Sequence, residues 1–258
     1  MPSPPNAAPT RGHMLQPAAT GRLRTVCAST GSAMAVFAAH WRRISRPVRH
    51  GSGSRERGPE HKSIVVLDMA GFGRWDNRAQ LRARTLLNAA VRAAFSAAGI
   101  GWSRLAVEDR GDGMIVFVPA TVSKADLLDP FVPVLAALIG MLGHDSLPFH
   151  RIRVRIALHC GEVHRDDHGW AGADVNLACR LVNAEAAYRC LREHPDADLV
   201  LVVSAVIYDG IVRHGYRTID PAAYRPIRVV AKEVDAAAWI HVRAGRHDHR
   251  GQAVRTWL

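Results

Sequence analysis

The sequence has few cysteines, and their spacing does not pair them. The 258 residues contain four, with no two in a CxxC pattern: Cys27, Cys160, Cys179 and Cys190. Structural zinc sites and disulfide frameworks need closely spaced or numerous cysteines. The sequence therefore disfavours a zinc knuckle and is compatible with a reducing compartment. We interpret the cysteines as small core hydrophobes.

The sequence also has no uninterrupted apolar run of the roughly 20 residues that a membrane helix needs. The apolar segment 127–142 is broken by Asp129, Pro130 and Pro133. The segment 26–39 imitates the centre of a secretion signal, but serine, threonine and glycine dilute it and no persuasive cleavage site follows. We therefore predict a cytoplasmic protein with no membrane span.

Aromatic residues make up only 6% of the chain, and its net charge of +11 is unevenly distributed. Residues 1–61 hold nine arginines against two glutamates, a net charge of +7, which leaves +4 for the other 197 residues. That segment is rich in Pro, Ala, Ser and Gly without an apolar period. We predict a basic disordered N-terminal arm over 1–61, a folded domain over 62–244 and a flexible C-terminal tail over 245–258. A solvated arm is favoured over contact with nucleic acid or anionic lipid, and the folded part lacks the aromatic stripe of a specific nucleic-acid partner.

From Lys62 onward, segments typical of strands and helices alternate. Strands are predicted over 63–69, 104–118 (two strands and a Gly-rich turn), 151–163 and 198–204, edge strands over 217–220, 227–232 and 237–243, and helices over 77–99, 124–142 and 174–194. In 151–163, apolar residues alternate with Arg151, Arg153 and Arg155, which predicts a strand with one buried face. This order predicts an α+β fold with a mixed or antiparallel sheet flanked by helices.

Two aspartates lie where predicted strands end. Asp68 ends the first strand, and Asp112 lies in the turn between the two strands of 104–118. A purely structural turn is one interpretation, because aspartate and glycine are favoured in hairpins. If the strands are neighbours, both carboxylates reach one sheet edge, where a divalent cation would remove their repulsion. Hard oxygen ligands of this kind suit magnesium or manganese bound to substrate phosphates.

Four motifs carry a family resemblance in their order and separation. They are LDMAGFG (67–73), RGDGMIVF (110–117), ALHCGEV (157–163) and GADVNLACRL (172–181). Together they resemble the catalytic domain of class III nucleotidyl (adenylate/guanylate) cyclases, closest to compact cyclase-like proteins of actinobacteria, over residues 63 to about 243. The resemblance implies a ferredoxin-like cyclase domain, two Mg²⁺ or Mn²⁺ ions, a nucleoside triphosphate substrate and a homodimer.

The resemblance also implies roles for single residues. Asp68 and Asp112 match the family's metal-binding aspartates, with the carbonyl of Met69 as a further ligand. Asn176 and Arg180 match its transition-state pair, and their i, i+4 spacing puts them on one helix face. The remaining matched positions would contact the triphosphate, through the loop and through a late lysine: Ala70, Gly71, Phe72, Gly73 and Lys232. The helix after the loop would offer unpaired N–H groups to the phosphates.

Base recognition is expected at two further positions. Glu108 occupies the position where guanylate cyclases of the family have glutamate, and its carboxylate can accept from the N1 and N2 protons of guanine. Gly169, at the partner position, has no side chain with which to read a base, so guanine is favoured only slightly over adenine. The loop departs from the family at Gly73, where a threonine hydroxyl is common.

Alternative interpretations remain open at the sequence level. Asn176 and Arg180 fit an ordinary polar helix face, and Lys232 fits an exposed strand charge. The loop cluster of His159, His164, Asp166, Asp167 and His168 is interpreted as a solvated hairpin, since it lacks a repeating ligand spacing. Two functions stand: a metal-dependent cyclase with its site at a homodimer interface, and a catalytically inactive cyclase-like domain that binds nucleotide or a protein partner.

Overall fold

A computed structural model describes residues 58–145 and 151–244. The predictions for residues 1–57 and 245–258, the apolar segment 26–39 among them, lie outside the described residues. The first strand begins at Glu60, two residues before the predicted start of the folded domain.

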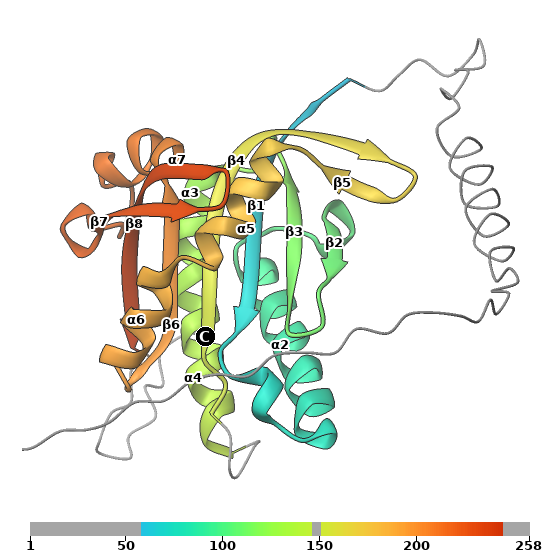
Figure 1. Cartoon of the computed structure of the whole chain (residues 1–258), viewed down its shortest axis with the longest axis vertical. Coiled ribbons are helices and arrows are strands. Elements are labelled where there is room, and N and C mark those ends of the chain that lie inside the picture. The colour runs from blue at the N-terminus through green and yellow to red at the C-terminus, as the bar shows by residue number, and fades with distance from the viewer. Residues whose placement is uncertain (1–57, 146–150, 245–258) are drawn as a thin grey trace, which may run out of the picture. The chain divides into compact units, whose positions relative to one another are not determined.

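One mixed sheet organises the described residues (Figure 1), and the predicted α+β fold is confirmed. Seven strands form the order β2-β3-β1-β4-β6-β8-β7, and β5 pairs with β4. Only β4 and β6 pair in parallel among these strands. The strands are β1 (Glu60–Met69), β2 (Ala106–Asp109), β3 (Gly113–Pro119), β4 (Val154–Asp166), β5 (Gly169–Ala171), β6 (Ala197–Ser204), β7 (Arg225–Ala231) and β8 (Val234–Ala244).

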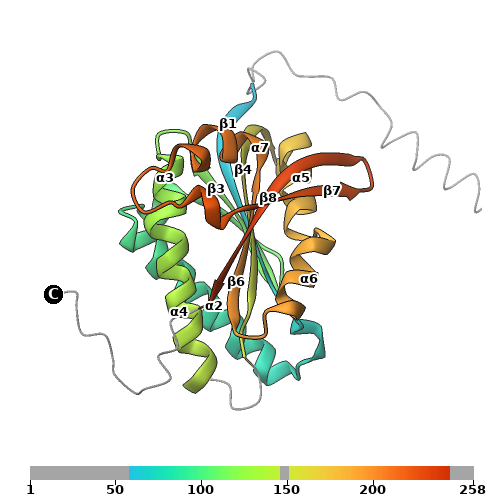
Figure 2. The ribbon, with the colours of Figure 1, turned by 90° about the vertical axis from the view of Figure 1, so that its left-hand side faces the viewer.

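Helices cover both faces of the sheet, with α2 and α4 on one side and α5 and α6 on the other (Figure 2). The longer helices are α2 (Asn77–Ala97), α4 (Val132–Asp145), α5 (Ala173–Val182), α6 (Glu185–Glu193) and α7 (Ala205–Gly210). A short helix α3 (Lys124–Asp126) and a π-helical segment η3 (Leu127–Phe131) lead into α4, and 3-10 turns lie at η1 (Phe72–Arg74), η2 (Trp102–Arg104), η4 (Val212–His214) and η5 (Pro221–Ala223).

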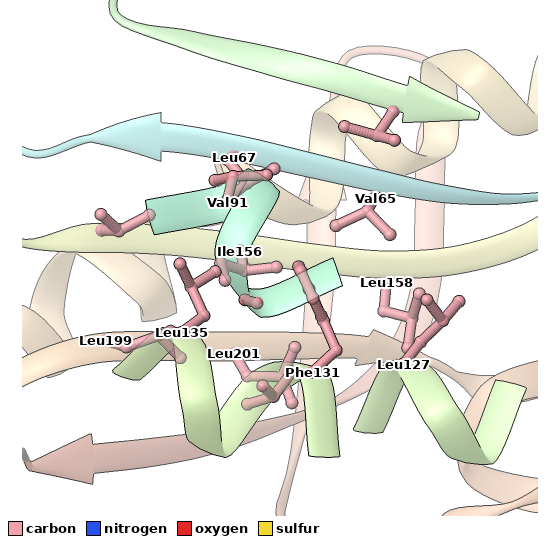
Figure 3. Packing of buried hydrophobic residues seen from close by; sticks show 14 of the residues in the cluster. Val65, Leu67, Val91, Leu127, Phe131, Leu135, Ile156, Leu158, Leu199 and Leu201 are labelled. Carbon is pink, nitrogen blue, oxygen red and sulfur yellow. The ribbon is translucent and has the colours of Figure 1, made fainter. Parts of the chain in front are cut away.

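Strand alternation produces two separate hydrophobic cores. Because successive side chains of a strand point to opposite faces, β1 sends Val65 and Leu67 toward α2 and α4, and Ile64 and Val66 toward α5 and α6. Figure 3 shows the first core, where side chains from β1, β4, β6, α2 and η3–α4 meet. The second core holds α5 against the sheet, so the faces of α5 that carry polar residues are fixed relative to β1 and β4.

The structure corrects several sequence predictions. The strand predicted over 151–163 is β4 (Val154–Asp166), and it is buried on both faces from Val154 to Cys160, where one buried face was predicted. Segment 217–220 is not a strand, and β8 lies inside the sheet between β6 and β7. The predicted helix 174–194 is two helices, since Ala184 takes an extended conformation between α5 and α6.

One helical stretch among the described residues, Lys124–Leu142, is long and apolar enough for a membrane span by length and composition alone. Its side chains explain its composition, because Leu127, Phe131, Leu135 and Ile139 are fully buried in the first core. A buried core helix passes the same length test, so this stretch is weak evidence for a span.

Candidate active site

Asp68 and Asp112 meet where the end of β1 lies beside the start of β3. Antiparallel pairing of β1 with β3 sets Asp68 opposite Gly113, and the amide of Met69 donates to the carbonyl of Asp112 at 2.8 Å. Gly113 makes this approach possible, since a Cβ there would lie 1.9 Å from the carbonyl oxygen of Leu67. The two carboxylates therefore converge as the strand pattern predicted. Their role as metal ligands remains a prediction.

Burial dominates the electrostatics of Asp68. Loss of solvent raises the pKa of Asp68 to about 6; the nearby Arg155 guanidinium opposes this shift, and the Asp112 carboxylate adds to it. Burial disfavours a charged carboxylate and a like charge disfavours it further. The pair of aspartates is thus a site of unresolved negative charge that a cation would relieve.

Arg155 is a site residue that the sequence analysis placed on an exposed strand face. It lies opposite Asp68 in the β1–β4 register, forms an ion pair with the Asp68 carboxylate, and its side chain is only 7% exposed. Its guanidinium carbon lies 3.8 Å from the ring centroid of Tyr188 on α6, a cation–π contact. The Nε of Arg155 has no hydrogen-bond partner in the described structure. Alternation alone could not show that α6 would cover this face.

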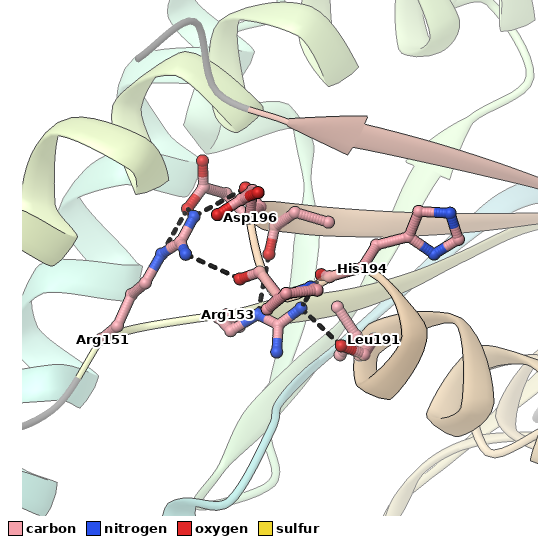
Figure 4. Close-up of polar contacts among 8 residues, drawn as sticks. Arg151, Arg153, Leu191, His194 and Asp196 are labelled. Carbon is pink, nitrogen blue, oxygen red and sulfur yellow. Dashed lines mark hydrogen bonds and ion pairs between the residues drawn. The ribbon is translucent and has the colours of Figure 1, made fainter. Parts of the chain in front are cut away.

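The two neighbouring arginines of the same strand face are structural (Figure 4). Arg153 donates to the carbonyl oxygens of Ala197, Leu191 and His194 at 2.5–2.7 Å. Arg151 binds the fully buried carboxylate of Asp198 and two carbonyls of the α6–β6 connection. All the acceptors of Arg153 that the structure shows are backbone carbonyls, although the residue also lines the cleft, whereas Arg155 pairs with the carboxylate of Asp68.

The loop after β1 has backbone amides without a hydrogen-bond acceptor among the described residues. The amide of Ala70 donates to the carbonyl of Arg153, but those of Gly71, Phe72 and Gly73 have no acceptor within the described residues. Gly71 has φ 78°, a conformation that favours glycine. At the start of helix α2 the Asp76 carboxylate caps the Ala79 amide, and the first residues of the helix are not part of the cleft lining. The loop itself is the part that suits an anion.

Asn176 and Arg180 share one face of α5, as predicted, and both line the same cleft as the aspartates. Asn176 is exposed, and Arg180 pairs with Glu233 of the β7–β8 turn at 3.1 Å. The cleft has a volume of about 1180 Å³. We name its two sides the carboxylate wall (Asp68, Asp112 and Arg155) and the helix wall (Asn176 and Arg180).

The other three predicted substrate contacts lie outside the cleft lining. Glu108 and Gly169 are neighbours: a Cβ on Gly169 would lie 2.6 Å from the Glu108 Oε1. Lys232 lies in the β7–β8 turn beside Glu233, with φ 53°. The structure brings the base-reading positions together but does not turn Glu108 toward the cleft.

The histidine cluster is divided by the structure. His164, Asp166, Asp167 and His168 lie at the β4–β5 hairpin, but His159 is buried in β4. Its Nδ1 lies 2.8 Å from the Ser204 hydroxyl and its Nε2 lies 3.0 Å from the Asp174 carboxylate. Placing His159 in a solvated loop was therefore wrong; it ties α5 to the sheet.

The donor chemistry fits a divalent cation held partly by substrate. No three or more His, Cys, Asp or Glu side chains gather as a metal site within residues 58–145 and 151–244. Two carboxylates with a backbone carbonyl from Met69 leave several coordination positions for phosphate oxygens and water, which suits magnesium. The repulsion between Asp68 and Asp112 gives the cation a reason to bind there.

Comparison with solved structures gives the same fold at low sequence identity. The guanylyl cyclase Cya2 matches with a TM-score of 0.52 and 14% identity over 75% of this chain and 98% of its own. An adenylate/guanylate cyclase/hydrolase from Silicibacter pomeroyi matches with a TM-score of 0.52 and 18% identity over 72% of this chain and 98% of its own.

A third match is a guanylate cyclase domain from Catenaria anguillulae in complex with GTP, with a TM-score of 0.51 and 17% identity over 73% of this chain and 98% of its own. No protein-family model matches the sequence, and no curated protein matches it. The fold is that of adenylyl and guanylyl cyclase catalytic domains.

Proposed function

We propose that this chain is a nucleotidyl cyclase, which converts a nucleoside triphosphate into its 3′,5′-cyclic monophosphate and pyrophosphate. The observation that carries the proposal is the convergence of Asp68 and Asp112 beside a loop whose amides have no acceptor among the described residues. The carboxylate wall offers two hard oxygen ligands, and the helix wall offers a guanidinium and an amide. The cyclase fold and the GTP-bound state of one solved neighbour support it.

Each wall has a separate task in this mechanism. Asp68 and Asp112, with the Met69 carbonyl, hold two Mg²⁺ or Mn²⁺ ions. When bound, these ions lower the pKa of the ribose 3′-hydroxyl and neutralise phosphate charge. Arg180 faces the negative charge that develops at the α-phosphate as the 3′-oxygen attacks and pyrophosphate leaves, and Asn176 orients the ribose.

Two groups of the carboxylate side bind the triphosphate. The amides of Gly71, Phe72 and Gly73 donate to phosphate oxygens, because they have no acceptor among the described residues. Arg155 would pair with the triphosphate if a metal ion took over the Asp68 carboxylate, which would keep this buried guanidinium paired in both states. Lys232 of the β7–β8 turn lies outside the cleft lining of its own chain, so its predicted contact with the terminal phosphates requires substrate held by the partner protomer.

We further propose that the active unit is a homodimer with two composite sites. Within one chain the two walls border the same open cleft. In the proposed dimer the carboxylate wall of one protomer works with the helix wall of its partner, so that each site takes Asp68 and Asp112 from one protomer and Asn176 and Arg180 from the other. The exposed Asn176 supports this arrangement, because it is available to substrate held by a second copy. A two-fold axis makes the two sites equivalent. The protein acts in the cytoplasm, where nucleoside triphosphates are abundant.

Direct product analysis tests the proposal. The full chain is incubated with ATP, GTP, CTP or UTP and manganese, and mass spectrometry measures cyclic monophosphate and pyrophosphate. We expect equal amounts of both products from at least one nucleotide. A folded chain that binds nucleotide and forms neither product contradicts the enzyme.

Two observations favour a second function. The ion pair with Arg155 occupies the Asp68 carboxylate, and Gly73 removes a hydroxyl near the phosphates. A cyclase-like domain that binds nucleotide without turnover, in a regulatory role, would tolerate both features. Nucleotide binding without product in the same experiment supports this alternative.

A further inference from the structure

Glu108 is held by two contacts that leave it little freedom to read a base. Its Oε2 accepts from Arg110 Nη2 at 2.5 Å, and its Oε1 accepts from the amide of Trp170 at 3.0 Å. Both oxygens are thus engaged within the chain. The Glu108 carboxylate joins β2 to β5 and is absent from the cleft lining.

The hydrogen bond from the Trp170 amide to Glu108 requires a glycine at position 169. A Cβ at this position would lie 2.6 Å from Glu108 Oε1, well inside contact distance, and φ 138° also strains any other residue. The missing side chain therefore serves the Glu108–Trp170 hydrogen bond. Glu108 and Gly169, which were expected to read the base, instead form a support that holds Arg110 and Trp170 in place.

The groups that this support presents to the cleft are Arg110 and Trp170. The Arg110 side chain is 52% exposed, and it lies close enough to Cys179 of α5 for its charge to act on that thiol. Trp170 stacks on Phe117 with ring centroids 5.0 Å apart, which fixes the indole. Glu108 uses one Nη of Arg110, so other guanidinium N–H groups remain for a ligand.

A guanidinium selects between purines by donor and acceptor pattern. It has donors only, and it pairs in bidentate fashion with two adjacent acceptors. Guanine presents such a pair at N7 and O6, whereas adenine presents an acceptor at N7 beside a donor at N6. An arginine in this position therefore favours a 6-oxopurine.

We propose that Arg110 is the specificity-determining residue of the site and that it selects guanine through O6 and N7, with Glu108 as the residue that positions it. This assignment rests on the proposed function, since it names the base of the nucleotide that the cleft takes. It differs from recognition by Glu108, which would read the N1 and N2 protons on the opposite edge of guanine.

Nucleotide analogues separate the two forms of recognition. Binding to the full chain with manganese is measured by displacement of a fluorescent GTP analogue with GTP, ATP, inosine triphosphate or 7-deaza-GTP. Inosine triphosphate keeps O6 and N7 but lacks the 2-amino group, and 7-deaza-GTP lacks N7. We expect inosine triphosphate to bind within about twofold of GTP, and ATP and 7-deaza-GTP to bind about tenfold more weakly.

Variants test the residues. Arg110→Met removes the donors but keeps a long exposed side chain, and it should bring GTP, ATP and 7-deaza-GTP to similar affinities. Glu108→Gln weakens the hold on Arg110 and should reduce the ratio of GTP to 7-deaza-GTP affinity by about threefold, an effect that loss of stability alone would not produce. Arg189→Met, on an exposed α6 pair 3.8 Å from Glu193, is the control and should leave the ratios unchanged.

Two results would overturn the assignment in different ways. Equal binding of GTP and 7-deaza-GTP, with weaker binding of inosine triphosphate, would return base reading to Glu108 and leave the proposed function intact. No binding of any nucleotide by the folded chain would overturn the proposed function and this assignment with it.

Discussion

The two walls of the cleft differ in how far their side chains are buried and paired within the chain. The carboxylate wall lies at the end of the internal strand β1, where Asp68 is mostly buried and paired with Arg155. The guanidinium of Arg155 lies against the ring of Tyr188. The helix wall is open, with Asn176 exposed and Arg180 held by Glu233, whose side chain is 56% exposed. A buried wall is organised before substrate arrives, whereas an open wall is suited to completion by substrate and a second protomer.

The largest effect is expected from loss of a carboxylate on the carboxylate wall. Asp68→Asn and Asp112→Asn should each lower turnover by at least about two orders of magnitude, because each removes a charged metal ligand while keeping side-chain volume. Pyrophosphate release measures turnover, and thermal unfolding verifies the fold. Asp209→Asn, on an exposed pair with Arg213, is the matched control. Near-normal turnover of either variant at saturating metal would remove that aspartate from the site.

Arginine replacements sharpen the contrast between Arg155 of β4 and Arg153, which directly precedes that strand. Arg155→Ala should weaken triphosphate binding by about tenfold to a hundredfold, because it removes a charged hydrogen-bond donor from the cleft. Arg153→Ala should leave affinity per folded molecule close to wild type but lower the free energy of unfolding by about 2 to 4 kcal/mol, since three carbonyls lose a charged donor.

Calorimetric nucleotide titration and urea unfolding measure the two quantities. Wild-type affinity in Arg155→Ala would make that residue structural, like its neighbours.

The different roles of these arginines also show which features of the fold and the site can be predicted from the sequence. Most strands and helices along the chain, and the meeting of Asp68 with Asp112, followed from alternation and turn residues, because these patterns are local. The second core and the internal position of β8 did not follow, because they depend on which elements pack together. The task of Arg155 did not, because Arg151, Arg153 and Arg155 are equivalent in the pattern and differ only in what packs above them. The sequence could not show the support made by Glu108 and Gly169 for a similar reason: it depends on contact between β2 and β5, where Glu108 and Trp170 are 62 residues apart.

The protonation of Asp68 gives a smaller effect in metal-free protein. Its pKa is raised to about 6 in the folded chain, against about 3.9 when unfolded. The folded state therefore holds the proton more tightly, so this stabilising contribution is present below about pH 3.9 and is lost as pH rises through 6. We expect the stability of wild type relative to Asp68→Asn to fall by roughly 2 to 3 kcal/mol between pH 4 and pH 7.

Urea unfolding in the presence of a chelator measures this difference at each pH. A difference that does not change with pH would mean that the Arg155 charge cancels the effect of burial.

The smallest effect concerns the open wall. Glu233→Gln removes the charge that competes with phosphate for Arg180, so triphosphate affinity should rise by about threefold at low salt and less at high salt. Asp235→Asn is the control, because it alters an exposed ion pair between Asp235 of β8 and Arg228 of β7, close to the same turn. Lower affinity in Glu233→Gln would instead make Glu233 a residue that positions Arg180 for substrate.

The central claim is that the two walls act together in one reaction centre shared between protomers. The direct measurement mixes inactive Asp68→Asn with inactive Arg180→Ala after subunit exchange has been verified. Half of the dimers are then mixed, and each mixed dimer has one site with both defects and one with neither. The account predicts recovery of about a quarter of wild-type turnover. No recovery would place both walls of each site in the same protomer and contradict the shared centre.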